Sequence, residues 1–211
     1  VGGYLEGAKD GSKLRRAAEM ALELKKPVMI MKVGRTGAGA RAASSHTGSL
    51  AGNDQVYDAF FKQMGIIRLE TLSELISFVI LHRSGRLPKG NNIGILSISG
   101  GAGVLMADHA EGLGLDVPEF TGETRRKLES YLPPFGSAKN PVDLTAVAVS
   151  EPEMLGKCLK ALIEDENIHM IALAMGFMAH MASVLANDVI EAFKSTDKPI
   201  AMATYVMNPS K

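Results

Sequence analysis

The sequence predicts an α/β protein made of two doubly wound halves, each with a mainly parallel sheet. Short apolar runs of strand length alternate with amphipathic segments of helix length along the 211 residues. The apolar runs are continuous, as expected for strands that are buried on both faces of a parallel sheet. The stretch SGRLPKGNN, residues 84–92, has the glycine, proline and basic content of a linker and divides the pattern in two.

In the first half, the opening VGGYLEG has the character of a strand end, and a helix follows it. Asp10 or Ser12 can cap this helix, which ends before Pro27. PVMIMKV, residues 27–33, predicts a strand that is buried on both faces. Residues 34–52 predict a long loop, because they are mostly glycine, alanine and hydroxyl residues with almost no large apolar side chain.

The first half then continues with a helix, a short strand and another helix. Asn53 or Asp54 can cap the first of these helices, which ends at Gly65, and IIRL predicts the strand. Thr71 and Glu74 have the spacing of a capping box, so we expect a helix over TLSELISFVILH.

The second half begins with IGILSIS as a strand, GGAG at residues 100–103 as a tight turn, and a helix that reaches Gly112. Helices and strands then alternate over TGETRRKLESYL, PVDLTA, EPEMLGKCLKALIE, IHMIALAM, ASVLANDVIEAFK and PIAMATYV. Both halves therefore have a flavodoxin-like or Rossmann-like layout. We place the domains at residues 1–86 and 87–211. Because both chain ends resemble strand ends without neighbours, we expect a fragment of a longer polypeptide, with either domain incomplete.

The composition argues against several classes of protein. Lys plus Arg and Asp plus Glu both number 23, so the chain has no excess of positive charge for a nucleic acid. No apolar run approaches the roughly 20 residues that span a bilayer, and no signal-peptide pattern opens the chain. We expect a soluble, cytoplasmic protein with no membrane partner. Cys158 is the only cysteine, which excludes an internal disulfide, and its helical setting predicts a small buried side chain.

His46 is the candidate for chemistry within the segment 34–52. The segment follows a buried strand, and ligands of open α/β sheets bind at the carboxyl ends of the strands. A neutral imidazole is nucleophilic near pH 7 and can carry a phosphoryl group. Ser44, Ser45 and Thr47 offer hydroxyl donors to such a group. The alternative remains a solvated histidine in a surface connection whose hydroxyls make ordinary turn hydrogen bonds.

Three charged residues could assist His46. Arg35 and Arg41 could bind a phosphate or could simply be solvated. Glu6, at the end of the expected first strand, could accept the second imidazole N–H and so fix one tautomer. Its sequence position alone favours the alternative, a surface or capping glutamate.

The turn at Gly100, Gly101 and Gly103 would present helix N-terminal amides to an anion. The dinucleotide-binding pattern G-x-G-x-x-G would need a glycine where Met106 stands, so a tight turn explains these glycines equally well. Asp143 could cap, bind a ligand or fix a loop. We predict no metal site, because no pair of the remaining histidines has zinc spacing backed by a third ligand. Packing is the expected role of Met175, Met178 and Met181.

Two long segments carry a resemblance to a known family. KPVMIMKVGRTGAGARAASSHTGSLAGNDQVYDAFFKQMGIIRL resembles the phosphohistidine domain of NDP-forming (ADP-forming) acyl-CoA synthetases, relatives of succinyl-CoA synthetase. IGILSISGGAGVLMADHAEGLGL and LPPFGSAKNPVDLTA resemble the flavodoxin-like domain that follows it in the same family. Together these segments cover nearly the whole chain.

The resemblance implies the reversible conversion of acyl-CoA, ADP and phosphate into the free acid, ATP and CoA. It assigns the phosphoryl carrier to His46 and the glutamate that orients it to Glu6. It also implies that the helices after YLEGAKDG and after SGGAG point their N-termini at the phosphorylated ring. Ser45, Thr47, Gly100, Gly101 and Gly103 then become the expected phosphate-binding residues.

The family's other parts are absent from these residues. The resemblance implies a CoA-binding Rossmann domain and an ATP-grasp domain that binds the nucleotide with Mg²⁺, as further domains or as subunits of a homo- or hetero-oligomer. The chain alone is therefore expected to be inactive in the complete reaction. Two alternatives stay open, a non-catalytic module that binds acyl-CoA or a nucleotide and a less favoured NAD-dependent oxidoreductase.

Overall fold

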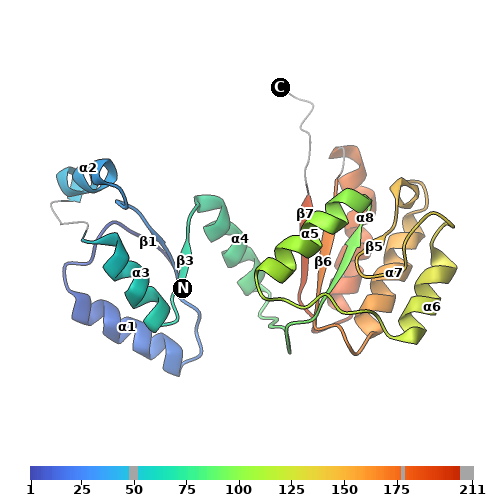
Figure 1. The fold of residues 1–211 in the computed structure, drawn as a ribbon, viewed down its shortest axis with the longest axis horizontal. Coiled ribbons are helices and arrows are strands. Elements are labelled where there is room, and N and C mark those ends of the chain that lie inside the picture. The colour runs from blue at the N-terminus through green and yellow to red at the C-terminus, as the bar shows by residue number, and fades with distance from the viewer. Residues whose placement is uncertain (48–51, 177–178, 205–211) are drawn as a thin grey trace. The chain divides into compact units, whose positions relative to one another are not determined.

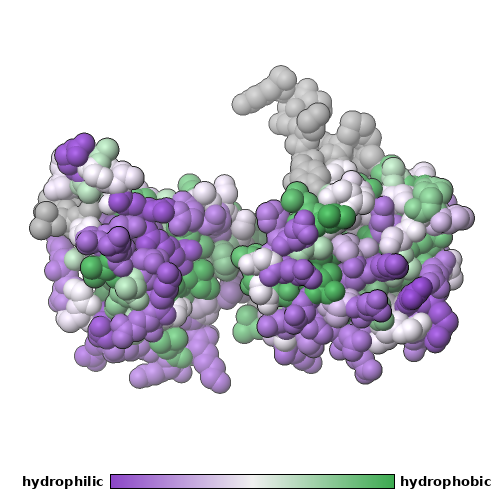
Figure 2. Space-filling view, viewed as in Figure 1, coloured by the Kyte–Doolittle hydropathy of each residue, from purple (hydrophilic) through white to green (hydrophobic). Residues whose placement is uncertain are grey.

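The structure is a computed structural model that describes residues 1–47, 52–176 and 179–204. The chain divides into two compact units, Val1–Ser84 and Gly85–Lys211. Each unit combines helices with one parallel sheet, which confirms the predicted α/β class (Figure 1). Hydrophilic residues cover most of the face shown in Figure 2. No helix among the described residues is both long enough and apolar enough to cross a membrane.

The first unit has a three-stranded sheet in the order β1-β2-β3, with all neighbours parallel. Its core is formed by Ala18, Ile30, Phe61, Met64 and Ile66, which belong to α1, β2, α3 and the turn after α3. The elements are β1 (Gly2–Leu5), α1 (Gly11–Glu23), β2 (Met29–Lys32), α2 (Gly37–Thr47), α3 (Asp54–Gln63), β3 (Ile67–Leu69) and α4 (Leu72–Arg83).

Side chains cap α1, α3 and α4 of the first unit as predicted. The Asp10 carboxylate accepts the N–H groups of Ser12 and Lys13 at the start of α1. Asn53 caps α3, and Thr71 accepts the N–H of Glu74 at the start of α4. The Glu74 carboxylate departs from the capping box, because it accepts the N–H of Glu70 and not that of Thr71.

The prediction of one long loop over residues 34–52 is wrong, because α2 occupies Gly37–Thr47. Four of its eleven residues are alanine, the residue with the highest helix propensity, and this outweighs the glycine content. Thr36 supports the first turn, since its hydroxyl accepts the N–H of Gly39 and its carbonyl that of Ala40. The segment 48–51, which carries the end of the SHTGSLAG motif, lies outside the described residues.

The second unit has a four-stranded parallel sheet in the order β5-β4-β6-β7. Its larger core includes Leu96, Leu155, Leu159 and Leu173, and Cys158 is buried among them as predicted. The elements are β4 (Ile93–Ser97), α5 (Gly100–Gly112), α6 (Gly122–Tyr131), β5 (Val142–Asp143), the 3₁₀ helix η1 (Ala146–Val149), α7 (Pro152–Glu164), β6 (Met170–Met175), α8 (Ala179–Lys194) and β7 (Ile200–Thr204).

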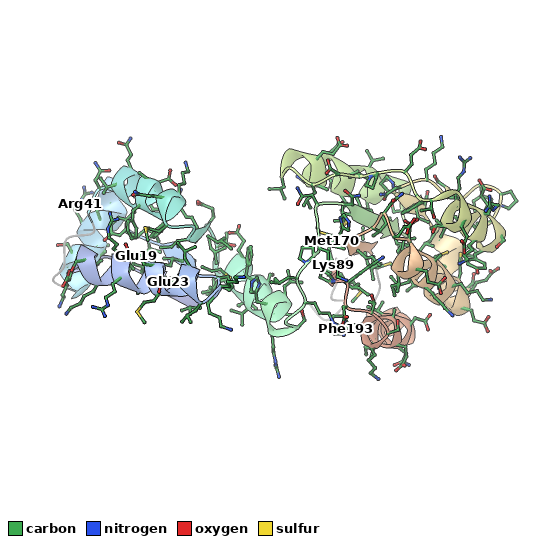
Figure 3. The ribbon with its side chains drawn as sticks, turned by 90° about the horizontal axis from the view of Figure 1, so that it is seen from below. Glu19, Glu23, Arg41, Lys89, Met170 and Phe193 are labelled. Carbon is green, nitrogen blue, oxygen red and sulfur yellow. The ribbon has the colours of Figure 1, made fainter. Side chains whose placement is uncertain are left out.

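The prediction that residues 100–103 form a tight turn before a helix is wrong, because these residues are the first turn of α5. The turn lies just before it, at residues 97–99, where the Ser97 hydroxyl accepts the N–H of Ser99 and donates to the carbonyl of Ser99. Near the start of this unit, the Arg86 guanidinium lies 3.5 Å from the ring centre of Phe193, which Figure 3 labels on α8.

Candidate functional site

The carboxyl edge of the first sheet brings together the two segments that the sequence singles out. Leu5 at the end of β1 lies opposite Lys32 at the end of β2. The N–H of Val33 continues this pairing by donating to the carbonyl of Leu5 at 3.0 Å. Glu6 therefore begins the loop beside the start of the segment that leads into α2. This is the edge at which open α/β sheets bind their ligands.

Glu6 is half-buried in this loop, and His46 is the second-last residue of α2. The side chain of His46 lies outside what the structure describes, so the orienting role of Glu6 stays a prediction. The Ser45 hydroxyl donates to the Ala42 carbonyl at 2.8 Å, one turn back along α2. Arg41 is exposed on the same helix (Figure 3).

Lys32 is a feature of the site that the sequence analysis missed. Its side chain is only 2% exposed, although it ends the central strand of the sheet. The ammonium donates to the carbonyl of Val33 and lies 4.7 Å from the ring centre of Tyr57. Burial lowers the pKa of Lys32, the neighbouring Asp54 opposes this shift, and Arg68 adds to it. A lysine inside the apolar run PVMIMKV was the signal that could have revealed it.

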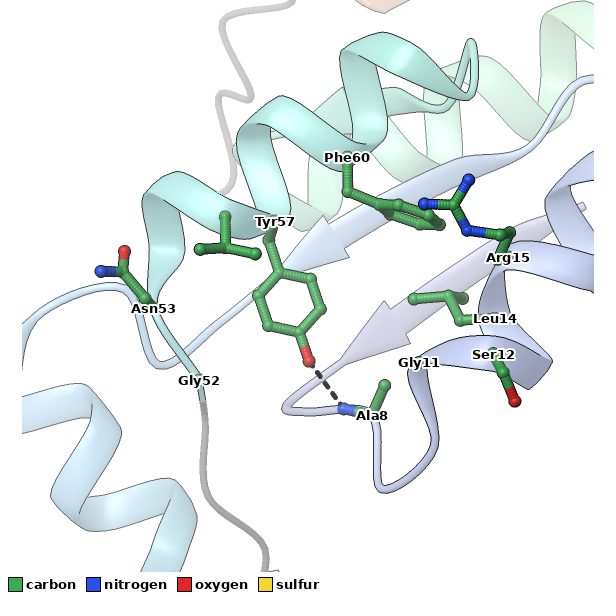
Figure 4. A pocket seen from close by; sticks show the side chains of 10 residues that line it. Ala8, Gly11, Ser12, Leu14, Arg15, Gly52, Asn53, Tyr57 and Phe60 are labelled. Atoms are coloured by element: carbon green, nitrogen blue, oxygen red, sulfur yellow. Dashed lines mark hydrogen bonds between the residues drawn. The ribbon is translucent and has the colours of Figure 1, made fainter.

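Tyr57 connects Lys32 with the loop that follows β1. Its hydroxyl accepts the N–H of Ala8, two residues after Glu6, at 2.8 Å (Figure 4). The ring lies in α3 and also packs edge-on against Phe61 at 5.9 Å between ring centres. Tyr57 is thus fixed at both ends, by the core of the unit and by the backbone of the loop.

A cavity of about 550 Å³ opens next to Tyr57, between α1 and α3 (Figure 4). Leu14, Val56 and Phe60 supply apolar walls, and the Arg15 guanidinium lies 5.8 Å from the ring centre of Phe60. The size and the mixture of apolar walls with a few polar groups are typical of sites for small organic ligands.

An ion-pair network joins β3 to α3 and includes Arg35. Arg35 pairs with Glu70, so the structure favours an ion pair over free solvation for this residue. Arg68 pairs with Asp54 at 2.7 Å and with Asp58 at 3.5 Å. The carboxylates of this network are therefore shared among several cations.

In the second unit, the start of α5 lies at the carboxyl edge of the sheet. Gly100 and Gly101 are exposed there, as a site for an anion at a helix N-terminus requires. Gly103 differs, because it is buried and its N–H donates to the carbonyl of Ser99. A Cβ atom at Gly103 would lie 3.2 Å from Pro141, so close packing explains this glycine.

Asp143, at the end of β5, fixes a loop, one of the three roles considered for it. Its carboxylate accepts the N–H of Thr145 at 2.9 Å. Thr145 has a φ of 59°, a conformation that costs energy in a β-branched residue and needs such support. The other oxygen of Asp143 would lie 3.0 Å from a Cβ atom at Gly100, which places the carboxylate against the start of α5.

Other histidines of the chain occupy positions that have a structural explanation. His169 accepts the N–H of Asn92 through Nδ1, and His82 and His109 lie in the last turns of α4 and α5. Within residues 1–47, 52–176 and 179–204, no three His, Cys, Asp or Glu side chains are grouped so that they could hold a metal ion.

Comparison with known proteins gives the family of the chain. Residues 1–81 match the succinyl-CoA ligase like flavodoxin domain, and residues 93–206, more than half of the chain, match the ligase-CoA domain. The chain has two α/β units, each with a parallel sheet, and each unit matches a domain of this kind. The chain therefore belongs to the NDP-forming acyl-CoA synthetase family, within the succinyl-CoA synthetase superfamily.

Two of the similar proteins are alpha subunits of ADP-forming acetate–CoA ligases. The alpha subunit of acetate–CoA ligase [ADP-forming] II from Pyrococcus furiosus is 38% identical over 99% of this chain and 46% of its own length. The alpha subunit of isoform I from the same organism is 43% identical over 79% of this chain and 34% of its own length.

A solved structure agrees with these relatives. The dinucleotide forming acetyl-coenzyme A synthetase 1 of Ca. Korarchaeum cryptofilum, in complex with phosphate and ADP, superposes with a TM-score of 0.81 at 27% identity. The match covers 99% of this chain and 46% of that one. The chain thus spans less than half the length of each of these three proteins.

Proposed function

We propose that this chain supplies the phosphoryl-carrying part of an ADP-forming acyl-CoA synthetase, with His46 as the carrier. The observation that carries the proposal is the juxtaposition at the first sheet edge, where the Glu6 loop and the segment leading to His46 follow neighbouring strands. The whole enzyme would convert acyl-CoA, ADP and phosphate into the acid, ATP and CoA. The named activities of the relatives support this reaction class.

The proposed reaction has three steps. A phosphate oxygen attacks the thioester carbonyl, the C–S bond breaks, and CoA leaves as the thiol with formation of an acyl phosphate. A ring nitrogen of His46 then attacks phosphorus, and the acid leaves as its carboxylate. Finally a β-phosphate oxygen of ADP attacks the phosphorus of the phosphohistidine, which yields ATP and the free imidazole.

The chain's own residues would prepare His46 for the second and third steps. Glu6 would accept one ring N–H and leave the other nitrogen free to attack phosphorus. Ser45 and Thr47 would donate hydrogen bonds to the phosphoryl oxygens, and the exposed N-terminus of α5 at Gly100 and Gly101 would stabilise a phosphoryl anion. Gly103 is buried, so it would support the start of α5 within the second unit by packing rather than by its amide.

The remaining requirements belong to parts of the enzyme outside this chain. An ATP-grasp domain would bind the nucleotide together with Mg²⁺, and a Rossmann domain would bind CoA, either in the same polypeptide or in partner subunits of an oligomer. Mg²⁺ would act there by neutralising the phosphates. A cytoplasmic location is part of the proposal, because the reaction draws on the intracellular pools of ATP and CoA.

Phosphohistidine labelling tests the proposal directly. The full-length protein is incubated with ³²P-labelled ATP and Mg²⁺, and the label should be acid-labile, base-stable and located on His46. His46→Asn should lose the label. The matched control His109→Asn, at an exposed position in the last turn of α5, should keep it. Label that persists in His46→Asn contradicts the proposal.

A non-catalytic binding module is the second candidate function, and the cavity between α1 and α3 favours it. Such a module would bind an acyl-CoA or a nucleotide without turnover. Calorimetry with CoA and with ADP, run beside an assay for ATP formation, separates the two functions. Binding without ATP formation by the full-length protein supports the module.

A further inference from the structure

Lys32 is a buried cation that the proposed mechanism does not use. An ammonium group loses its hydration on burial, and this cost is usually offset by a carboxylate partner or by several hydrogen bonds. At Lys32, the contacts found among the described residues are the Val33 carbonyl and the face of the Tyr57 ring. Neither of them carries a formal charge.

The nearby carboxylates do not balance Lys32. Asp54 attracts the ammonium but forms its short ion pair with Arg68, at 2.7 Å. Asp58 is shared between Lys62 and Arg68, and Glu70 pairs with Arg35. Arg68 repels the Lys32 ammonium. Asp54 attracts Lys32 more strongly than Arg68 repels it, but both cations share this one carboxylate, so its single negative charge does not neutralise Lys32 as well as Arg68.

The position of this charge matches the proposed site. Lys32 is the last residue of β2, and the chain continues from Val33 into the segment that carries His46. Lys32 also contacts the ring of Tyr57, whose hydroxyl accepts the N–H of Ala8 in the loop that begins with Glu6. One lysine thus supports both segments of the site. In a site of low dielectric constant, such a charge acts more strongly on an anion than it would in water.

We propose that Lys32 supplies the buried positive charge that stabilises the phosphoryl anion at the carboxyl edge of the first sheet, with Tyr57 as the positioning residue. The inference rests on the proposed function, because it requires a phosphoryl group at this edge. It explains why a strand that is otherwise apolar ends in a charged and almost completely buried side chain.

Lys32→Met tests the inference, because it removes the charge and keeps an unbranched side chain. An uncompensated buried charge destabilises the fold, so Lys32→Met should melt at the same temperature as the wild type or higher. The equilibrium fraction of phosphorylated His46, measured in the full-length protein with labelled ATP and Mg²⁺, should fall at least tenfold. Lys26→Met, which removes an exposed lysine from the connection between α1 and β2, is the matched control and should change neither quantity.

The two readouts separate an electrostatic role from a structural one. A merely structural Lys32 would make Lys32→Met melt at a lower temperature and leave the phosphorylated fraction of the folded molecules unchanged, which would overturn the inference. If Lys32→Met does not fold, Lys32→Gln removes the charge with a polar side chain and should show the same tenfold loss. Tyr57→Leu keeps the lysine but removes the ring, and should lower the fraction less than Lys32→Met does.

A binding measurement distinguishes failure of this inference from failure of the proposed function. If the wild type takes no label at all, the proposed function fails. Calorimetric titration of the full-length protein with orthophosphate then tests the charge alone. Binding at least tenfold tighter in the wild type than in Lys32→Met supports the inference, and equal binding by both proteins overturns it.

Discussion

The Tyr57 hydroxyl accepts the backbone N–H of Ala8 at 2.8 Å, a hydrogen bond between residues 49 positions apart in the chain. It holds the loop that follows β1 against α3, and this loop begins with Glu6. The geometry of the proposed site therefore depends on a side chain that has no expected role in the chemistry.

Tyr57→Phe should loosen this loop. The substitution keeps the ring and its contacts but leaves the Ala8 N–H without its acceptor, which costs about 1 kcal/mol of folding free energy. Chemical denaturation should show this loss, and the amide of Ala8 should exchange its hydrogen faster. The control is Tyr4→Phe, since Tyr4 lies on β1 with its side chain largely exposed. Unchanged exchange at Ala8 would contradict the assigned hydrogen bond.

Lys32 should give the fold a pH dependence of known sign. Its pKa is lowered in the folded state, chiefly by burial. Between that lowered value and the ordinary lysine pKa of about 10.4, the unfolded chain binds more protons than the folded one, so the contribution of Lys32 to stability rises with pH. Below this interval both states are protonated and the penalty of burying the charge is fully present.

Comparison of the wild type with Lys32→Met isolates this dependence. The variant lacks the titrating group, so any stability that it gains over the wild type should shrink as the pH rises toward 10. Melting temperatures of both proteins between pH 7 and about pH 10 measure the difference. A difference that stays constant over this range, or grows, means that burial does not lower the pKa of Lys32.

Much of the secondary structure of the first unit can be predicted from the sequence, because helix caps depend on residues only a few positions apart. The caps by Asp10, Asn53 and Thr71 follow from side chains that bind N–H groups two or three positions ahead. The helix α2 was missed for a related reason. Glycine and serine in residues 37–47 suggest a loop, whereas the alanines and the support from Thr36 favour a helix.

The contacts that assemble the site could not be predicted in the same way. The bond between Tyr57 and Ala8 and the stacking of Lys32 on Tyr57 join residues that only the fold brings together. The sequence places Glu6 and the His46 segment at one sheet edge, because parallel strands end on the same side. The sequence does not predict which side chains, here Lys32 and Tyr57, pack under these two segments.

Cys158 should be chemically silent in the folded protein. It has no exposed surface, and burial raises the pKa of its thiol to about 12. The reactive species is the thiolate, which is then scarce at pH 8 as well as inaccessible. A disulfide reagent such as Ellman's reagent should therefore titrate no thiol in the native chain at pH 8 and one thiol in guanidinium chloride. A rapid reaction of the native chain would contradict the buried position.

Asn140 should be the most sensitive polar side chain of the second sheet. Strand β5 pairs only with Leu96 and Ser97 of β4, and beyond an isolated bridge from Asp116 to Asn92 no strand of the described residues pairs with the earlier part of β4 on that side. Asn140 takes its place, because its amide oxygen accepts the N–H of Ile95 and its NH₂ group donates to the carbonyls of Ile93 and Pro118. One side chain thus satisfies three backbone groups.

Asn140→Ala should remove all three hydrogen bonds and lower the folding free energy by about 3 kcal/mol, since each unsatisfied buried group costs about 1 kcal/mol or more. Asn140→Asp can still accept from Ile95, but at neutral pH its carboxylate faces two carbonyl oxygens, and it should be at least as destabilising. Protonation restores one donor, so Asn140→Asp should recover part of its stability relative to Asn140→Ala as the pH falls toward about 4. Denaturation curves and the hydrogen exchange of the Ile95 amide measure these effects. Asn91→Ala, at an exposed position two residues before β4, should match the wild type in both measurements.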